Sequence, residues 1–153
     1  MQKTGLKYVT FLTFMLVMTG CGSGLPSDLE YQNVVKVQWL QADVVSGSSG
    51  QRVMWFQLFD RSGDQQSINF YRNAPDEVRG HPARVSDNSI WVLVAGRFEI
   101  RLNADNNAGS AGSPENMTRL LEAFDLRAMA AYEGEALDGE GLVRFLPDLP
   151  GGG

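Results

Sequence analysis

The chain has 153 residues, of which 43% are hydrophobic and 20% charged, as expected for a single globular domain. It carries 13 Lys and Arg against 18 Asp and Glu, a formal charge of −5, so the basic surface typical of nucleic-acid binding is not expected. One Cys excludes an internal disulfide, and one His excludes a metal site built from several histidines.

The N-terminus has the pattern of a secretory signal. Lys3 and Lys7 precede Tyr8–Met18, an uncharged and largely apolar run of eleven residues. A run of this length is too short to cross a bilayer core, which needs about 20 residues, but it fits the apolar region of a signal peptide. We therefore expect residues 1–20 to be a cleaved signal.

The segment Met18-Thr19-Gly20-Cys21 resembles the lipobox of bacterial lipoproteins, with Met18 where Leu is usual. In that family the signal is cut just before the cysteine, whose sulfur carries a diacylglyceryl group and whose new amino group is usually acylated, for example with palmitate. The resemblance, which covers residues 1–21, implies that Cys21 is a lipid anchor. Two or more acyl chains hold a protein stably on a membrane.

Other interpretations of this segment are an ordinary cleaved signal with an accidental cysteine, an uncleaved anchor, or a buried N-terminal helix. Within the lipoprotein resemblance, Gly22 rather than Asp follows Cys21. The proteobacterial sorting rule then implies the periplasmic face of the outer membrane. A Gram-positive source would remove this distinction between membranes.

The rest of the chain divides by composition into three parts. Residues 21–30 are the lipidated cysteine and a flexible tether, 31–133 a β-rich domain with a helix near 114–132, and 134–153 an acidic tail rich in Gly and Pro. Strands followed by a helix indicate an α+β fold. We expect an antiparallel sheet or a small β-sandwich of about five to six strands, with a C-terminal helix.

Alternating or continuous apolar runs mark the expected strands. Residues 52–59 are apolar on both faces, so this strand should be central and covered on both sides. The two-residue turn Ala95-Gly96 predicts a hairpin, and residues 73–82 read as a loop. The expected strands are 34–40, 52–59, 67–72, 83–86, 89–95 and 97–102, with 142–146 as a candidate terminal strand.

Ser113-Pro114-Glu115 has the residue types that begin a helix, with Ser as N-cap and Pro in the first helical position. The apolar stripe that follows has helical spacing. It consists of Met117, Leu120, Leu121 and Phe124.

Several polar groups invite a catalytic or metal interpretation, but none completes one. Asn103–Asn107 and Asp60–Asp64 place oxygens at alternate positions, as calcium loops do, yet their other positions do not match, which favours solvated turns. His81 has neither a nucleophile motif nor a free cysteine to work with. The acids Glu133, Glu135, Asp138 and Glu140 indicate a solubilising tail. We predict no catalytic residues, no metal and no cofactor.

The aromatic residues of the strands remain. Most of them should belong to the core, but Trp39 and Trp91 lie on strands that could have an exposed face. An exposed aromatic patch on a sheet would mark a binding surface for a protein or a ligand.

The function favoured by this pattern is a noncatalytic binding or assembly module, anchored to the membrane by lipid and facing a protein partner in the cell envelope. One alternative is a small hydrolase that uses two carboxylates, because Asp and Glu are abundant. Another is a component of a secretion machine. Residues 52–60 are similar to a core strand of the small outer-membrane lipoprotein of type VI secretion, which is a β-sandwich.

Overall fold

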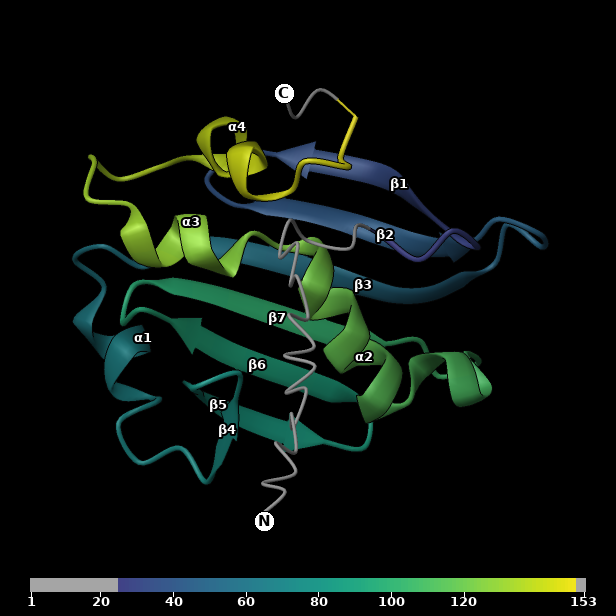
Figure 1. The fold of residues 1–153 in the computed structure, drawn as a ribbon, viewed down its shortest axis with the longest axis horizontal. Coiled ribbons are helices and arrows are strands. Elements are labelled where there is room, and N and C mark those ends of the chain that lie inside the picture. The colour runs from purple at the N-terminus through teal and green to yellow at the C-terminus, as the bar shows by residue number, and fades with distance from the viewer. Residues whose placement is uncertain (1–24, 151–153) are drawn as a thin grey trace, which may run out of the picture.

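The computed structural model describes residues 25–150, and their strands form one antiparallel sheet of seven (Figure 1). The strands are β1 (Leu29–Lys36), β2 (Leu40–Ser46), β3 (Arg52–Asp60), β4 (Asp76–Val78), β5 (His81–Ser86), β6 (Ser89–Val94) and β7 (Phe98–Ala104). Their order across the sheet is β1-β2-β3-β7-β6-β5-β4. The protein is therefore a mixed α+β fold, with β3, β7 and β6 in the middle.

Short helices follow or interrupt the strands. They are α1 (Gln65–Asn69), α2 (Pro114–Leu120), α3 (Leu126–Ala131) and α4 (Gly139–Leu142), with the 3₁₀ turns η1 (Gly109–Gly112), η2 (Leu121–Ala123) and η3 (Val143–Phe145). In Figure 1, α2, α3 and α4 all lie in front of the sheet, whereas α1 lies beyond the end of β3. Within residues 25–150, no helix has the length and apolar character needed to cross a membrane.

The core lies between the sheet and these helices. On β3, Phe56 points toward the helical layer and its ring lies 5.1 Å from that of Phe124. On β7, Phe98 does the same, with its ring 5.0 Å from that of Phe145. Because strand side chains alternate, all residues in register with these two on neighbouring strands face the same core. They include Leu40, Ala42, Leu58, Ile90, Val92, Ile100 and Leu102, each at most 1% exposed.

The opposite face of the sheet, which we call the open face, has no helical layer among the described residues. The expectation that residues 52–59 are covered on both sides is therefore wrong. On that strand, Trp55 and Phe59 face outward and are half-buried. The apolar residues on this side include aromatic rings, which are shielded by one another and by arginines, and the buried Leu93 in register with Glu99. The small β-sandwich is also wrong, since all seven strands belong to one sheet.

Two local predictions are confirmed. Ala95 and Gly96 form the turn between β6 and β7, with φ of 53° and 67°. Both angles lie in the left-handed region that this hairpin turn needs, even though Ala pays about 1–2 kcal/mol there. Ser113 is the N-cap of α2, where its hydroxyl accepts a hydrogen bond from the amide of Asn116.

Several predicted elements differ in the structure. The strand expected at 34–40 is interrupted by a bend at 37–39 between β1, which begins at Leu29 within the expected tether, and β2. The strand expected at 67–72 is replaced by α1, because the Asp64 carboxylate caps a helix there by accepting bonds from the Ser67 amide at 3.1 Å and hydroxyl at 2.6 Å. The loop expected at 73–82 contains β4, and residues 40–46 add a further strand, so the count is seven rather than five to six. The helix expected near 114–132 is broken by extended backbone at Phe124.

The terminal strand expected at 142–146 is also wrong, since these residues belong to α4 and η3. Asp138 caps α4 by accepting a hydrogen bond from the amide of Gly141 at 2.9 Å. Leu142, Phe145 and Leu146 are at most 1% exposed, because they fill the space between the helical layer and the sheet. Much of the acidic tail is thus part of the core.

Candidate binding site on the open face

Aromatic rings and a guanidinium group alternate across the open face. Trp39 lies 6.1 Å from Phe59 between ring centroids, and the Arg101 guanidinium lies 5.4 Å from Phe59 and 4.4 Å from Trp91. Trp91 lies in turn 6.2 Å from Phe70. These five residues, which we call the aromatic row, join the bend after β1 to the segment after α1 across the centre of the sheet.

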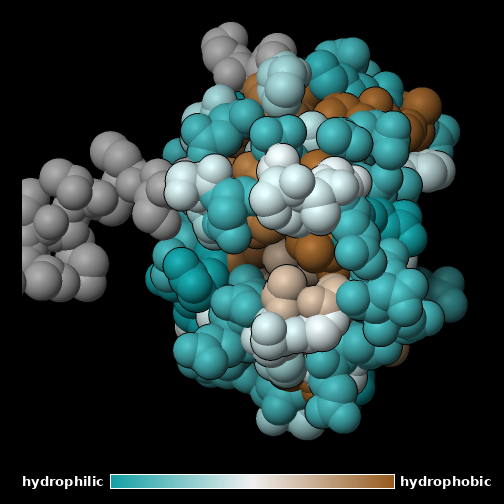
Figure 2. Space-filling view, turned by 90° about the vertical axis from the view of Figure 1, so that its right-hand side faces the viewer, coloured by the Kyte–Doolittle hydropathy of each residue, from teal (hydrophilic) through white to brown (hydrophobic). Residues whose placement is uncertain are grey.

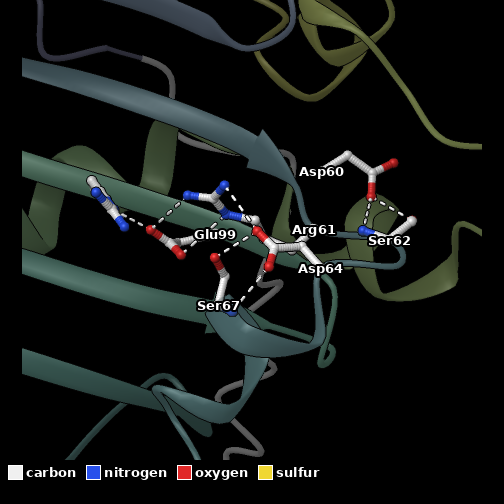
Figure 3. Close-up of polar contacts among 7 residues, drawn as sticks. Asp60, Arg61, Ser62, Asp64, Ser67 and Glu99 are labelled. Atoms are coloured by element: carbon white, nitrogen blue, oxygen red, sulfur yellow. Dashed lines mark hydrogen bonds and ion pairs between the residues drawn. The ribbon is translucent and has the colours of Figure 1, made fainter.

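A buried carboxylate holds the row in place. The side chain of Glu99, on β7, is only 1% exposed and lies between two guanidinium groups. Arg61 donates to it from Nε at 3.3 Å and from Nη2 at 3.4 Å, and Arg101 donates from Nε (Figure 3). The Arg61 guanidinium also lies 3.9 Å from the Phe59 ring centroid. Glu99 therefore fixes two arginines against the rings of the row.

Tyr71 lies close to this ion cluster and is 2% exposed. Burial, together with the negative charge of Glu99, raises the pKa of its hydroxyl above the ordinary value. Tyr71 is therefore neutral at physiological pH. Its ring packs edge-on against Phe70 at 5.3 Å, which places it beneath one end of the aromatic row.

Beside the row, a cavity of about 570 Å³ lies at the end of the sheet where β3 begins and β7 ends. Trp55 on β3, Asn103 on β7 and Trp91 on β6 line it from three adjacent strands. Its other lining residues are polar except for one alanine: Arg52, Asn88, Ser89, Ala104, Asp105, Asn106 and Asn107. Figure 2 views this end, where hydrophilic residues surround a hydrophobic centre. The volume is typical of small-molecule sites.

The charges at the cavity are paired with one another. Arg52 donates to Asp105 at 3.0 Å and to Asp43 at 3.3 Å. The amide of Asn107 and the Arg52 side chain, in that order, lower the pKa of Asp105 below its ordinary value. Asp105 is thus ionised at neutral pH, and the guanidinium of Arg52 is balanced by two carboxylates.

Asn103 sets the position of one cavity wall. Its Oδ1 accepts a hydrogen bond from the Trp91 indole Nε1 at 3.3 Å. That bond also assigns the amide orientation, since Oδ1 is the acceptor. The Nδ2 atom is buried and has no hydrogen-bond partner within residues 25–150. Asn103 therefore fixes the indole that joins the cavity to the aromatic row.

The residues predicted as a binding surface both lie on the open face. Trp39 and Trp91 are half-buried, and they stand apart, with Phe59 and Arg101 between them. Only Trp91 lines the cavity. The predicted lipidation site, Cys21, lies outside the described residues.

The weaker candidates separate in space or take up structural partners. Figure 3 shows Asp60 beside Ser62, turned away from Asp64, which caps α1 and accepts from Arg61 at 3.5 Å. His81 begins β5. Across residues 25–150 there is no group of three His, Cys, Asp or Glu side chains that could hold a metal ion.

Among the residues that line the cavity, only Trp91 was predicted from the sequence as part of a binding surface. Trp55 lies on the strand that the sequence predicts to be covered on both sides, and that prediction places its side chain in the core. Arg52 stands at the start of that strand as an ordinary charged residue. Its two partners, Asp43 and Asp105, come from β2 and from the turn after β7, and no local sequence pattern predicts a pairing over such a distance in the chain.

Comparisons of the chain with protein-family models, with curated proteins and with solved structures found no match. We therefore infer function from the chemistry of the open face. That face offers flat apolar rings, fixed guanidinium groups and a cavity lined with carboxamides, all of which are suited to recognition.

Proposed function

We propose that this protein is a lipid-anchored cell-envelope lipoprotein, held at the periplasmic face of the outer membrane, and that it acts as a noncatalytic binding module. The open face is its binding surface. The observation that carries this proposal is the aromatic row lying beside the cavity, on the side of the sheet opposite α2, α3 and α4.

The proposal is supported by the fixed positions of the arginine side chains that contact the aromatic rings of the row. Aromatic and arginine side chains are the types enriched where proteins bind partners. Here Glu99 fixes Arg61 and Arg101 before any partner arrives. Because less side-chain freedom is lost on binding, such preorganisation favours affinity.

The hydrolase alternative receives less support. Glycoside hydrolysis by carboxylates needs two acids at the cleft, one of them with a raised pKa so that it can donate a proton. Asp105 is the one acid among the residues that line the cavity, and its pKa is lowered. This arrangement favours binding over catalysis.

The binding surface can be tested with a photo-reactive diazirine side chain placed on each side of the molecule in intact cells. Phe70, 44% exposed on the open face, is the test position, and exposed Ala130 on α3, on the helical side, is the control. We expect adducts from position 70 at several times the yield from position 130, measured by gel mobility and mass spectrometry. Equal yields would contradict the assignment of the open face.

The lipid anchor is tested by fractionation of a Cys21→Ala variant. Loss of Lys3 and Lys7 with the signal leaves a mature net charge of −7, and an acidic domain gains nothing from anionic headgroups. We therefore expect the variant to appear in the soluble fraction after a mild salt wash, while the native protein stays in the membrane pellet. A variant that remains in the pellet would remove the basis for the anchor.

A further inference from the structure

We infer that the cavity between Trp55 and Trp91 binds an uncharged saccharide. The inference rests on the proposed function, because it assigns a ligand class to part of the same open face. Three features of the cavity lead to it: the two indole walls, the amides between them, and the pairing of its charges.

The two tryptophans provide flat apolar walls. They rise from β3 and β6, the strands on either side of β7, and are offset by two residues along the sheet, so two strand spacings and this offset put their backbones about 12 Å apart. A sugar ring has an apolar face of C–H groups that stacks on such a ring, while its edge carries hydroxyls. Asn103, between the walls, fixes the Trp91 indole, so this platform is set before a ligand binds.

The polar lining suits hydroxyl groups. Four carboxamides line the cavity. All but Asn103, whose Oδ1 accepts from Trp91 and whose Nδ2 is buried, offer both donors and acceptors, as neighbouring sugar hydroxyls also do. Three of these amides are on the rim, outside the sheet. The four are Asn88, Asn103, Asn106 and Asn107, with the hydroxyl of Ser89 beside them.

The charges argue against ionic ligands. Arg52 is the one cation among the lining residues, and two carboxylates already hold it, at 3.0 Å (Asp105) and 3.3 Å (Asp43). An anionic ligand would have to displace one of these partners and meet the other. A cation would compete with Arg52 itself. An uncharged polyhydroxylated ligand leaves the three charges as they are.

The test uses the full purified lipoprotein in a polyoxyethylene detergent, because glycoside detergents would themselves be ligands. The probes are tetramers of N-acetylglucosamine, cellulose and maltose, followed by calorimetry and tryptophan fluorescence. We expect at least one to bind with a Kd of about 10 μM to 1 mM. The Trp55→Ala variant should bind it at least tenfold more weakly, and Trp55→Phe should retain part of the affinity.

Two further variants keep the test decisive if Trp55→Ala folds poorly. Asn106→Ala changes an exposed rim residue and should weaken binding about threefold. Glu77→Ala changes an exposed residue of β4 that belongs neither to the cavity nor to the aromatic row, and should leave the Kd within twofold.

The inference is overturned if no probe binds at about 10 mM, if Trp55→Ala and Asn106→Ala both bind normally, or if inorganic phosphate displaces the saccharide. These results would leave the open-face proposal standing as long as crosslinking at position 70 succeeds. Failure of that crosslinking alone would count against the wider surface and not against the cavity.

Discussion

Replacement of Glu99 by alanine is expected to lower the free energy of unfolding by about 3 kcal/mol, the lower end of the range for breaking a buried ion pair. The carboxylate is 1% exposed, and its removal leaves Arg61 and Arg101 without the acceptor that both share. Their side chains are 17% and 28% exposed, so water relieves part of the cost. The measurement is the midpoint and slope of urea unfolding.

Two comparisons make this result specific. Glu99→Gln keeps the size and one acceptor oxygen, so it should lose less stability than the alanine variant. Glu77→Ala, at an exposed position on β4, should stay within about 0.5 kcal/mol of the native protein. If Glu99→Ala matches Glu77→Ala, the buried cluster contributes nothing to stability and the preorganisation argument fails with it.

The Asp60→Asn variant should lose about 3 kcal/mol, because this carboxylate joins three parts of the chain. Its side chain is 1% exposed. Arg97 donates to both its oxygens, at 3.0 and 2.7 Å, the Ser62 amide at 2.9 Å and hydroxyl at 2.6 Å, and the Leu137 amide at 2.8 Å. An asparagine would turn an NH₂ group toward these donors.

The Asp60→Asn substitution should reduce local stability most in the segment between α3 and α4. Arg97 also donates to the carbonyl oxygens of Gly134 at 3.0 Å and Glu135 at 2.9 Å, so Asp60 orients the side chain that holds this connection. We expect amide hydrogen exchange of residues 133–138 to rise in Asp60→Asn, while exchange in β6 and β7 changes little. Uniform acceleration across the sheet would instead indicate general destabilisation.

The same carboxylate gives stability a defined dependence on pH. Burial by itself would raise the pKa of Asp60, but hydrogen bonds from Arg97, Ser62 and Leu137 outweigh it and lower the pKa to about 2 from 3.8. Its ionised form therefore contributes about 2 kcal/mol above pH 4, and that contribution disappears as the pH falls from about 4 to 2. Urea unfolding of the native protein and of Asp60→Asn should show that the difference between their free energies of unfolding shrinks over that pH range. A difference that stays constant would contradict the depressed pKa.

Local signals in the chain were reliable where the structure they specify is also local. The hairpin at Ala95-Gly96 and the helix start at Ser113 depend on a few neighbouring residues, and both are present. The strand predicted at 67–72 failed because Asp64 caps a helix there, a bond that outweighs the alternation of Ile68 and Phe70.

The binding site was predicted only in part. Trp39 and Trp91 were predicted as candidates because both were expected on strands, although Trp39 lies in the bend between β1 and β2. The cavity and the ion cluster were not predicted. Glu99 alternates with the apolar residues Phe98 and Ile100, a pattern typical of a solvent-exposed side chain, whereas Glu99 is fully buried. Its burial depends on arginines from β7 and from the segment after β3, and on Tyr71 beyond α1, which no short window can bring together.

The sequence alone excluded an internal disulfide and a metal site built from several histidines, and it contained the local strand and helix signals. It also contained the lipobox pattern. A signal peptide is recognised by its residues and not by a fold, so the lipid anchor stays a prediction. The tertiary structure decided which face of the sheet the helices cover. Alternation with a period of two shows which side chains share a face of the sheet, but β3 is apolar on both faces. Distant residues such as Phe124 and Phe145, which pack on one side, decided which face the helices cover. That packing left the aromatic row and the cavity open on the other.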